Sequence, residues 1–549
     1  MWINVTTIGD LVDRQAEVNG DTALVMPGVR LTYPQLSAAS DRFAAGLAGL
    51  GVERGDKVGI LMPAGLDYVL ALFGAAKIGA VAVPINGRFK RHEAGYVIGH
   101  ADLKVMLTGA DPHGMDYPAL VSEIISPDGK GSGGDESELV STLSHVVCLT
   151  GRVDGFLSRA DFEAAGEAVS FDEIKTRQKR VRVRDIALLM YTSGTTALPK
   201  GCLLTHEALT RQGEKVAKTR FFLTRGEGFW DPLPLFHCGG IVPMLGCFSV
   251  GAKYCHAGHF DAGQAIRTIE KERCTVLYPS FEAIWLPVLE HPDFGKADFS
   301  HVRLIQNIAT PERMAQFEER MPWAKQVTSY GSTECATNLT MGLPDEPFEV
   351  RAKTLGKPVE GMEVKITDPE TGEKLGPGVM GELCFRGYSC FEGYYKDTAQ
   401  TAAAFDSDGF FHSGDRASID QGGNLVFGGR LKDMLKVGGE NVAAIEVEDF
   451  LIRHPAVKVA QVVGVRDERY GEVPAAFVEL REGATVSGAA LVEFCMGAIA
   501  TYKVPRYVRF VTEWPMSGTK VKKFELRDSL TGELDAKGIR EAPRPGSKK

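Results

Sequence analysis

Two hydrophobic periodicities alternate along the first hundred residues. The stretches IGDLVDRQAEV (8–18) and LSAASDRFAAGLAGLGV (36–52) repeat apolar residues at helical spacing. Between and after them, VGILMP (58–63), AVAVPI (80–85) and KVMLT (104–108) are short apolar runs typical of buried strands. The alternation recurs beyond residue 186. It predicts an α/β arrangement with a largely parallel sheet.

The most apolar stretch, YVLALFGAAKIGAVAVPI, covers residues 68–85. Lys77 interrupts it and Pro84 lies near its end, so we expect a core helix that leads into a strand rather than a membrane span. The first residues, MWINVTTIGDLVDRQ, do not place a basic region before an apolar one, which a secretory signal requires. We therefore expect a cytoplasmic protein that is not an integral membrane protein.

The composition and hydrophobic pattern of the sequence change near residue 430. Before it, SPDGKGSGGDESE (126–138) is rich in Gly, Ser and Asp and predicts a surface insertion. After it, residues 443–457 have the pattern of a helix, and residues 457–465 and 474–482 have the pattern of strands. The tail therefore has the content of a small α+β domain.

With 549 residues, the chain exceeds the size at which one core stops growing. We predict a large N-terminal α/β domain, residues 1–430, with mainly parallel sheets and packed helices. A small mobile α+β domain follows at residues 431–549, with a hinge near residues 429–431.

Charge and cysteine content narrow the function. The chain has 62 basic and 71 acidic side chains and a net charge of −9, which does not suggest a nucleic-acid partner. An anionic ligand would need a small site with its own positive groups. The ten cysteines are scattered singly, without CxxC pairs or ligand-spaced histidines, which indicates a reducing compartment.

The segment YTSGTTALPKG (191–201) combines hydroxyl side chains, glycines and one lysine. It follows the apolar run IALLMY (186–191) and precedes CLLTHEALTRQ (202–212), whose apolar spacing is compatible with a helix. Bare backbone amides, hydroxyls and an ammonium suit a polyphosphate. Pro199 precedes Lys200 and Gly201 follows it, so the segment is not a Walker A loop.

Further motifs follow this loop in a fixed order: SYGSTE (329–334), FFHSGD (410–415), GRLKD (429–433), GGENV (438–442), YKVPR (502–506) and MSGTKVKK (516–523). With these motifs, residues from about 7 to 527 resemble the adenylate-forming superfamily, which includes acyl-CoA synthetases, firefly luciferase and the adenylation domains of peptide synthetases. Such enzymes activate a carboxylate by attack on the α-phosphate of ATP, release pyrophosphate and pass the acyl group to a thiol.

The resemblance implies an ATP site in the large domain. Its β,γ-phosphate loop would be Thr192, Ser193, Gly194, Thr195, Thr196 and Lys200. Tyr330 and Gly331 would lie at adenine, Thr333 at the α-phosphate, and Glu334 with Thr192 would bind Mg²⁺. His237, in PLFHCGG, would line the carboxylate channel and position the substrate.

The resemblance also implies roles near and beyond the hinge. Asp415 would accept the ribose hydroxyls, and Phe427 and Arg430 would help to hold the nucleotide. Lys520 matches the adenylation lysine and Lys432 the hinge. Lys436 and the glycine-rich segment would serve coenzyme A, with Gly438, Gly439 and Glu440 as its members. We interpret Lys522 and Lys523 as a solvated basic face, and Tyr502, Lys503 and Arg506 as either CoA contacts or plain surface.

Four positions depart from the family pattern. Ser413 replaces the usual threonine of TGD, and Thr519 replaces the glycine before the adenylation lysine. In NIATPE (307–312), Asn307 and Ile308 replace glycines that precede the adenine pocket, so that we assign contacts only to Ala309 and Thr310. These changes bear on the acyl pocket and on the mobility of the lysine loop.

The sequence therefore predicts an ATP-dependent carboxylate:CoA ligase, an AMP-forming acid–thiol ligase of fatty-acid metabolism that uses ATP, Mg²⁺ and coenzyme A. The PLFH, GGENV and RHPAV segments favour an aliphatic or alicyclic acid. We expect the acyl pocket to draw on residues 236–244, 278–285 and 335–339. An aryl-acid CoA ligase, an adenylating enzyme that delivers to a carrier protein and a non-enzymatic binding module are the alternatives, and a homodimer is left open.

Overall fold

The computed structural model describes residues 6–125, 142–192, 199–437, 440–496, 498–517 and 520–544. The insertion expected at residues 126–138 lies outside them. Two compact units divide the chain: Met1–Glu363 with Phe385–Phe411, and Val364–Cys384 with His412–Lys549. The border expected at residues 430 and 431, where the small domain would rotate, stays a prediction.

Two seven-stranded sheets form the first unit. In the first sheet every pair is parallel except β8–β9, and in the second every pair is parallel except β1–β2. The first has the order β7 (Leu157–Ser158), β6 (His145–Cys148), β5 (Leu103–Thr108), β3 (Lys57–Leu61), β4 (Val81–Pro84), β8 (Ile186–Thr192), β9 (Lys200–Thr205). The second has the order β14 (Lys325–Val327), β13 (Leu304–Ile308), β12 (Cys274–Phe281), β10 (Gly228–Asp231), β11 (Lys253–His256), β1 (Thr22–Met26), β2 (Val29–Thr32). The α/β class with mainly parallel sheets is confirmed.

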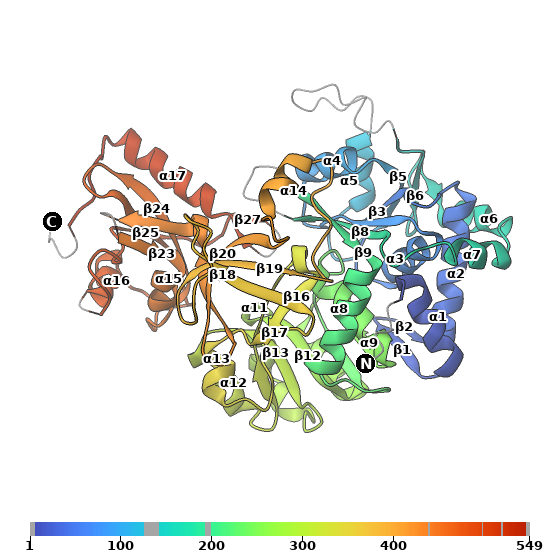
Figure 1. Ribbon diagram of the computed structural model, residues 1–549, viewed down its shortest axis with the longest axis horizontal. Helices are drawn as coiled ribbons and strands as arrows, with labels where there is room; N and C mark the ends of the chain where they lie inside the picture. The colour runs from blue at the N-terminus through green and yellow to red at the C-terminus, as the bar shows by residue number, and fades with distance from the viewer. Residues whose placement is uncertain are drawn as a thin grey trace. The chain divides into compact units, whose positions relative to one another are not determined.

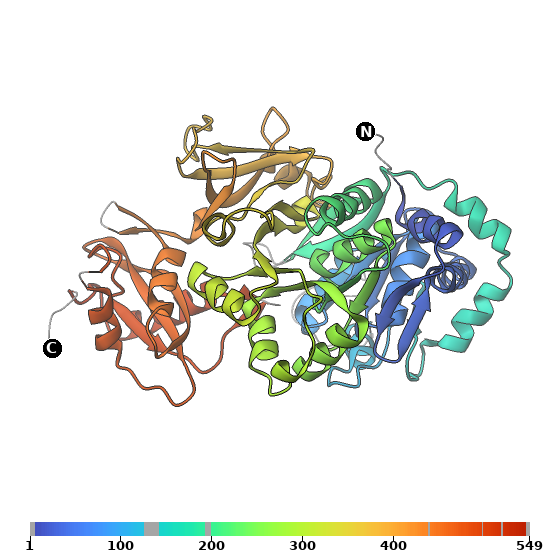
Figure 2. The same ribbon diagram turned by 90° about the horizontal axis from the view of Figure 1, so that it is seen from below.

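Helices pack on these sheets, and a small three-stranded sheet accompanies them. Figure 1 shows α1, α2, α6 and α7 grouped together, and Figure 2 shows the teal helices α6 and α7 on the outside of this group. The helices are α1 (Ile8–Val18), α2 (Tyr33–Gly49), α3 (Leu66–Ile78), α4 (Arg91–His100), α5 (Tyr117–Ile125), α6 (Arg159–Glu167), α7 (Phe171–Gln178), α8 (His206–Thr219), α9 (Cys238–Val250), α10 (Ala262–Glu272), α11 (Glu282–Glu290), α12 (Pro311–Arg320), α13 (Phe348–Lys353), α14 (Thr398–Ala404), η1 (Phe294–Lys296) and η2 (Thr333–Cys335). The small sheet has the order β15 (Ser329–Ser332), β16 (Thr337–Met341), β17 (Lys357–Pro358).

The second unit contains most of a four-stranded sheet and all of a five-stranded one. The four-stranded sheet has the order β18 (Met362–Thr367), β19 (Gly381–Gly387), β20 (Phe411–Ile419), β21 (Leu425–Arg430). The other elements are η3 (Leu431–Asp433), β22 (Met434–Val437), β23 (Glu440–Ala443), α15 (Ala444–Ile452), β24 (Val457–Asp467), β25 (Gly471–Leu480), α16 (Gly488–Cys495), β26 (Tyr507–Phe510), β27 (Met516–Ser517), β28 (Lys520–Val521) and α17 (Lys523–Ala536). Buried residues of α15, α16 and the five-stranded sheet form one apolar core, which confirms the α+β character of this region.

The apolar stretch at residues 68–85 forms α3 and β4, as its pattern predicts. Within the described residues, no helix is long and apolar enough to cross a membrane. All ten cysteines lie in the described part of the chain, and none forms a disulfide.

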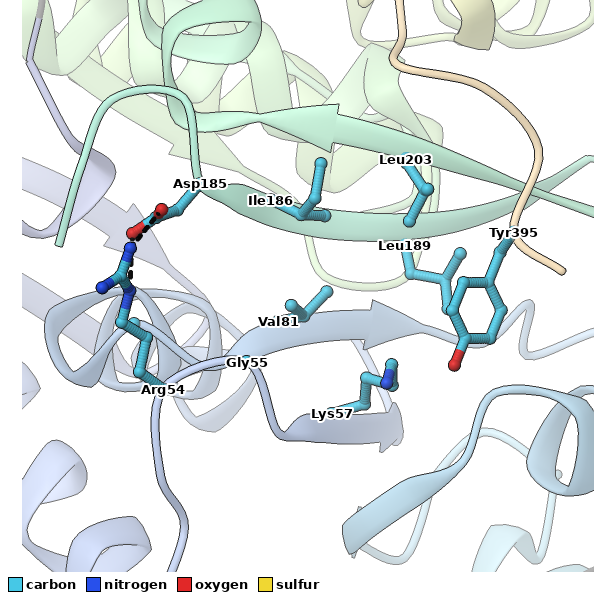
Figure 3. A pocket seen from close by; sticks show the side chains of 10 residues that line it. Arg54, Gly55, Lys57, Val81, Asp185, Ile186, Leu189, Leu203 and Tyr395 are labelled. Atoms are coloured by element: carbon cyan, nitrogen blue, oxygen red, sulfur yellow. Dashed lines mark hydrogen bonds and ion pairs between the residues drawn. The ribbon is translucent and has the colours of Figure 1, made fainter. Parts of the chain in front are cut away.

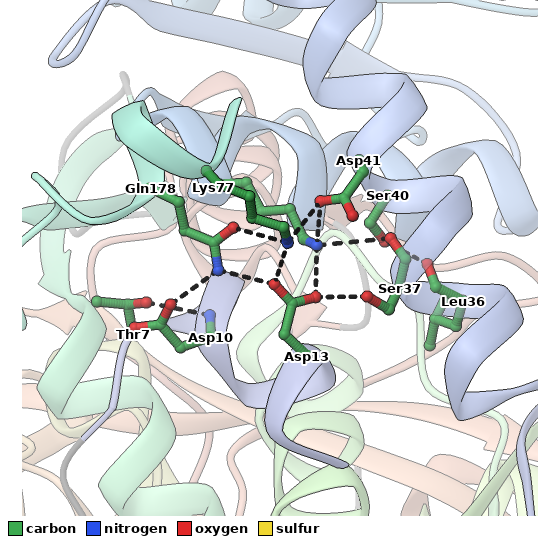
Figure 4. Close-up of polar contacts among 10 residues, drawn as sticks. Thr7, Asp10, Asp13, Leu36, Ser37, Ser40, Asp41, Lys77 and Gln178 are labelled. Atoms are coloured by element: carbon green, nitrogen blue, oxygen red, sulfur yellow. Dashed lines mark hydrogen bonds and ion pairs between the residues drawn. The ribbon is translucent and has the colours of Figure 1, made fainter. Parts of the chain in front are cut away.

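Lys77, which interrupts that stretch, is fully buried in a polar cluster (Figure 4). Its ammonium lies 2.6 Å from an Asp13 carboxylate oxygen and 2.5 Å from an Asp41 oxygen. Lys175 and Gln178 also donate hydrogen bonds to Asp13. Burial alone would raise the pKa of Asp13, but the Lys77 charge and the hydrogen bonds lower it to about 2.

Replacing the buried lysine should destabilise the first unit. In Lys77→Met, Asp13 and Asp41 lose the ammonium between them, and breaking such a buried pair costs about 3–5 kcal/mol of unfolding free energy. Urea unfolding measures the loss. Lys175→Met is the matched control with a smaller expected loss, because its side chain is 27% exposed. The pKa of Asp13 is lower in the folded protein than its value of about 3.9 in the unfolded chain. The ionised Asp13 therefore stabilises the fold above about pH 3.9, and this contribution is lost as the pH falls towards 2. Equal losses in the two variants would contradict the assignment of Lys77 as the central cation.

Candidate active site

Strands β8 and β9 flank the segment that is expected to bind polyphosphate. These strands are antiparallel, and Thr192 lies opposite Lys200 across the pair. Ser193, Gly194, Thr195 and Thr196 lie outside the described residues. The pairing therefore brings the two described ends of the segment together, at the carboxyl end of β8, where ligands of α/β sheets usually bind.

The helix expected over residues 202–212 is wrong in its first four residues. Residues 200–205 form β9, and α8 begins at His206, where the Thr205 side chain caps the helix by accepting a hydrogen bond from the Ala208 amide. The pairing of residues 200–205 with β8 is a contact between separate segments, and helical spacing in a short window does not reveal it.

Tyr394 connects the loop to Glu334, and the sequence analysis missed it. Its backbone forms a bridge with Cys202 of β9, and the neighbouring Tyr395 amide donates to the Gly201 carbonyl at 2.7 Å. The Tyr394 hydroxyl donates to a Glu334 carboxylate oxygen at 3.3 Å, and the Lys200 ammonium lies 5.3 Å from the centre of its ring. Burial, and next the Glu334 charge, raise the pKa of Tyr394. The GYYKD segment (393–397) is the signal that could have found it.

Tyr394→Phe should remove the hydroxyl that orients Glu334 and keep the ring under Lys200. A hydrogen bond to a charged group contributes about 1.5–3 kcal/mol, so we expect kcat/KM for MgATP to fall at least about tenfold. Pyrophosphate release at varied MgATP measures the change. Tyr388→Phe is the matched control, because this hydroxyl donates to Gln212 instead. An unchanged kcat/KM in Tyr394→Phe would remove the tyrosine from the site.

The SYGSTE segment folds into a tight turn that fixes Glu334. Gly331 is required in β15, because a Cβ there would lie 1.7 Å from the Thr337 carbonyl oxygen. Thr333 and Glu334 form η2, and Ala336 and Thr337 follow in the left-handed region at φ 51° and 85°. Such strain persists only where the surroundings enforce it, and it is common at functional sites. Tyr330 is buried in β15.

His237 precedes the first turn of α9, and its ring lies 4.7 Å from that of Phe236. The three segments expected to form the acyl pocket come together. Helix α9 contacts β16, and the Tyr278 hydroxyl of β12 donates to the Asn338 side chain of β16 at 3.0 Å.

The NIATPE segment ends β13 and begins α12. Thr310 caps α12, because its hydroxyl accepts a hydrogen bond from the Arg313 amide, and Ala309 packs on the core beside it. The Asn307 side chain is fully buried, and neither amide atom has a hydrogen-bond partner among the described residues. Ile308, by contrast, is 42% exposed at the carboxyl end of its strand.

In the second unit, Asp415 and Arg430 face each other across β20 and β21. The Arg430 Nε lies 3.3 Å from an Asp415 carboxylate oxygen. Asp415 is 7% exposed, and Phe427 lies on the same strand as Arg430. Ser413, which replaces the family threonine, donates to the Leu383 carbonyl at 2.6 Å, so its hydroxyl anchors the turn.

The remaining predicted residues are described in part. Gly438, Gly439 and the side chains of Glu440, Lys432 and Lys520 lie outside what the structure describes, although Lys520 begins β28. Lys436 lines a pocket of about 530 Å³ with two arginines, Arg466 and Arg527.

Two expectations about basic residues need correction. Lys523 is not on a solvated face: its ammonium lies 2.6 Å from Glu448, which is 6% exposed. Arg506 is not surface either, because it is 8% exposed and packs over the Tyr470 ring. Lys503 is paired with Glu446. These partners are distant in sequence, so that charge runs alone do not identify them.

A separate pocket of about 510 Å³ opens elsewhere in the first unit (Figure 3). Arg54, paired with Asp185, lies at one end, and Lys57 lies at the other, 5.1 Å from the centre of the Tyr395 ring. The first residues of β3, β4 and β8 line it, whereas Thr192 ends β8. The pocket therefore lies at the amino ends of these strands and is not the phosphate site.

Comparison with known proteins identifies the class that this fold and these motifs define. The model of the AMP-binding enzyme family matches residues 12–395, and that of the AMP-binding enzyme C-terminal domain matches residues 446–520. YngI of Bacillus subtilis (strain 168), whose name assigns it provisionally to the acyl-CoA synthetases, is 35% identical over 95% of this chain and 97% of its own. The mitochondrial medium-chain acyl-CoA ligase ACSF2 of Mus musculus is 30% identical over 96% of this chain and 88% of its own.

A solved structure supports the same class of enzyme. The anthranilate CoA ligase AuaEII, in complex with anthranoyl-AMP, matches with a TM-score of 0.82 and 26% identity over 97% of this chain and 99% of its own. The chain therefore belongs to the AMP-binding enzyme family, the adenylate-forming superfamily, and is an AMP-forming acyl-CoA ligase. ATP and coenzyme A are the substrates that this family implies.

Proposed function

We propose that this enzyme joins an aliphatic or alicyclic carboxylic acid to coenzyme A through an acyl-adenylate, with Mg²⁺ bound to ATP. The observation that carries the proposal is the contact of Glu334 with Tyr394 and of Tyr394 with Lys200 at the phosphate loop. It combines an anionic metal ligand, an orienting hydroxyl and a cation for the leaving pyrophosphate.

The residues fit Mg²⁺. A carboxylate and a hydroxyl are oxygen donors of the kind that Mg²⁺ accepts beside phosphates and water, and Glu334 and Thr192 would supply them. Bound Mg²⁺ would neutralise phosphate charge as the α-phosphate is attacked. Lys200 and the loop hydroxyls would hold pyrophosphate, Thr333 the α-phosphate, and Asp415 with Arg430 the ribose. His237 would keep the acid in line with the α-phosphate.

The segments expected to form the acyl pocket mix apolar and small side chains, which suits an aliphatic or alicyclic acid. An aryl acid is the second candidate, and the likeness to the anthranilate CoA ligase favours it. We further propose a role in fatty-acid metabolism and a cytoplasmic location, which suits ten cysteines without disulfides.

Ile308 should limit the size of the acid, because it puts a branched side chain where the family pattern has glycine. In Ile308→Gly, kcat/KM for longer or bulkier acids should rise about tenfold relative to short acids, as expected for a few methylenes in an apolar pocket. The ratio of kcat/KM across an acid series measures this change. Ile539→Gly, at a position of similar exposure (38%) outside the expected acyl pocket, is the control variant. A parallel change for all acids would mean that Ile308 does not border the acyl chain.

For the second half-reaction, we propose that Lys436, Arg466 and Arg527 attract the phosphates of coenzyme A. They line one pocket together with Glu472 and Asp528, and none of the three cations pairs with a carboxylate within the described residues. The ligase function as a whole is tested by pyrophosphate release over a panel of aliphatic, alicyclic and aryl acids, with and without CoA. We expect AMP and an acyl-CoA in equal amounts with the preferred acid. Turnover without CoA dependence would favour carrier-protein delivery, and no release with any acid would favour a binding module.

A further inference from the structure

Three potential metal ligands meet on two adjacent strands of the second unit. Glu382 and Cys384 are two residues apart on β19, which places them on the same face of the strand, and His412 lies on the neighbouring β20. The His412 Nδ1 lies 2.8 Å from a Glu382 carboxylate oxygen and 3.5 Å from the Cys384 sulfur. The three ligand atoms all lie within 4.8 Å of one another.

Their donor set and spacing suit zinc. Thiolate, imidazole and carboxylate are the groups that bind Zn²⁺, with Zn–S about 2.3 Å and Zn–N about 2.0 Å. At a tetrahedral angle these bond lengths put sulfur and nitrogen about 3.5 Å apart, which is the distance in the structure. The nitrogen and the carboxylate oxygen would have to separate by about half an ångström, to about 3.3 Å, which a small rotation of Glu382 permits.

The surroundings allow a metal to enter. Cys384 is fully buried, but the His412 and Glu382 side chains are 30% and 13% exposed, so that a water can complete the coordination. On binding, the Cys384 thiol releases its proton to solvent, and the neutral His412 keeps its proton on Nε2. Two anionic ligands then balance the charge of the ion, which suits a partly buried site.

The same residues hold the turn that carries Asp415. The other Glu382 oxygen accepts a hydrogen bond from the Gly414 amide at 3.0 Å, and the Ser413 hydroxyl anchors to Leu383. We propose that Glu382, Cys384 and His412 form a zinc site, and that loading it shifts this turn and weakens ATP binding. The effect on ATP rests on the ribose role proposed for Asp415; the metal site itself does not.

Cobalt titration of the full-length, chelator-treated enzyme tests the site. Co²⁺ bound to a thiolate gives a charge-transfer absorption, and we expect one such ion per chain, displaced by Zn²⁺. Cys384→Ser should lose the absorption, and His412→Gln should weaken Co²⁺ binding at least about tenfold. Cys495→Ser, which removes another buried cysteine of the second unit, should keep it. No thiolate absorption in the wild type, or its persistence in Cys384→Ser, would overturn the site.

A kinetic measurement tests the coupling. With free Zn²⁺ buffered at the level that fills the site, the KM for MgATP should rise several-fold in the wild type and Cys495→Ser and stay constant in Cys384→Ser. If Cys384→Ser does not fold, Glu382→Gln serves as the second zinc-insensitive variant. An equal rise in all variants would overturn the coupling. Failure of the proposed function would look different: the zinc-free wild type would release no pyrophosphate even with MgATP and the panel of acids.

Discussion

Lys520→Ala should lower acyl-adenylate formation by about 10² to 10³, the loss expected when one preorganised charge-stabilising donor is removed. By resemblance, its ammonium bridges the substrate carboxylate and the α-phosphate, where charge develops during attack. The resemblance implies that this lysine acts only when the small domain is in its adenylation orientation. Transfer to CoA from a supplied synthetic acyl-adenylate should therefore stay close to the wild-type rate. Both half-reactions are measured on the same preparation, so a folding defect would reduce both.

Lys522→Ala is the matched control for this experiment. Lys522 lies two residues away and pairs with Glu525 at 3.0 Å. Lys523→Ala is less suitable, because it would leave the buried Glu448 without its ammonium and should destabilise the second unit. If Lys522→Ala lost only adenylation and Lys520→Ala did not, the alignment across Thr519 would be wrong by two residues.

Glu334→Gln should reduce Mg²⁺-dependent adenylation by at least about 10² while the fold stays intact, because one charged group that stabilises the transition state is lost. The amide oxygen of glutamine can still accept the hydrogen bond from Tyr394, and the backbone carbonyl of residue 334 still accepts from the Phe391 amide. Only the negative charge offered to the metal disappears. Pyrophosphate release at several Mg²⁺ concentrations measures the effect.

Glu392→Gln is the control for the loss of one carboxylate, because Glu392 follows Phe391, whose amide donates to the Glu334 carbonyl. Glu392 is 38% exposed and pairs with Arg184, so its substitution should leave activity within a few-fold of wild type. Thermal unfolding should be unchanged in Glu334→Gln. Normal turnover of Glu334→Gln at ordinary Mg²⁺ would contradict the assignment of this residue as a metal ligand.

Much of the fold follows from local patterns. Helix α1 covers the residues that its spacing predicts, because an amphipathic stripe and the Thr7 cap act within one segment. The strands of residues 457–465 and 474–482 also form as predicted. The start of α8 was misplaced because the pairing of β9 with β8 joins separate segments. The burial of Lys77 depends on Asp13 and Asp41, 64 and 36 residues away.

In the candidate site, too, local sequence predicts some residues, and others are found only from contacts between distant segments. Motifs predict residues for the chemistry, such as Glu334, Asp415 and Lys200, and the family comparison supports the reaction class. They did not identify Tyr394, since its importance comes from contacts with Lys200 and Glu334, in segments about 190 and 60 residues earlier. Nor did they predict that Lys523 pairs with a buried carboxylate. Individual site roles stay predictions until the variants are measured.

The path of one oxygen atom tests the adenylate mechanism most directly. The enzyme is supplied with ATP, Mg²⁺, CoA and its preferred acid, labelled with ¹⁸O in both carboxylate oxygens. If the carboxylate attacks the α-phosphate and CoA then displaces AMP, one ¹⁸O must appear in the phosphate of each AMP formed, as acyl-CoA accumulates. Label in inorganic phosphate together with ADP, or acyl-CoA formation with no label in AMP, would contradict the mechanism.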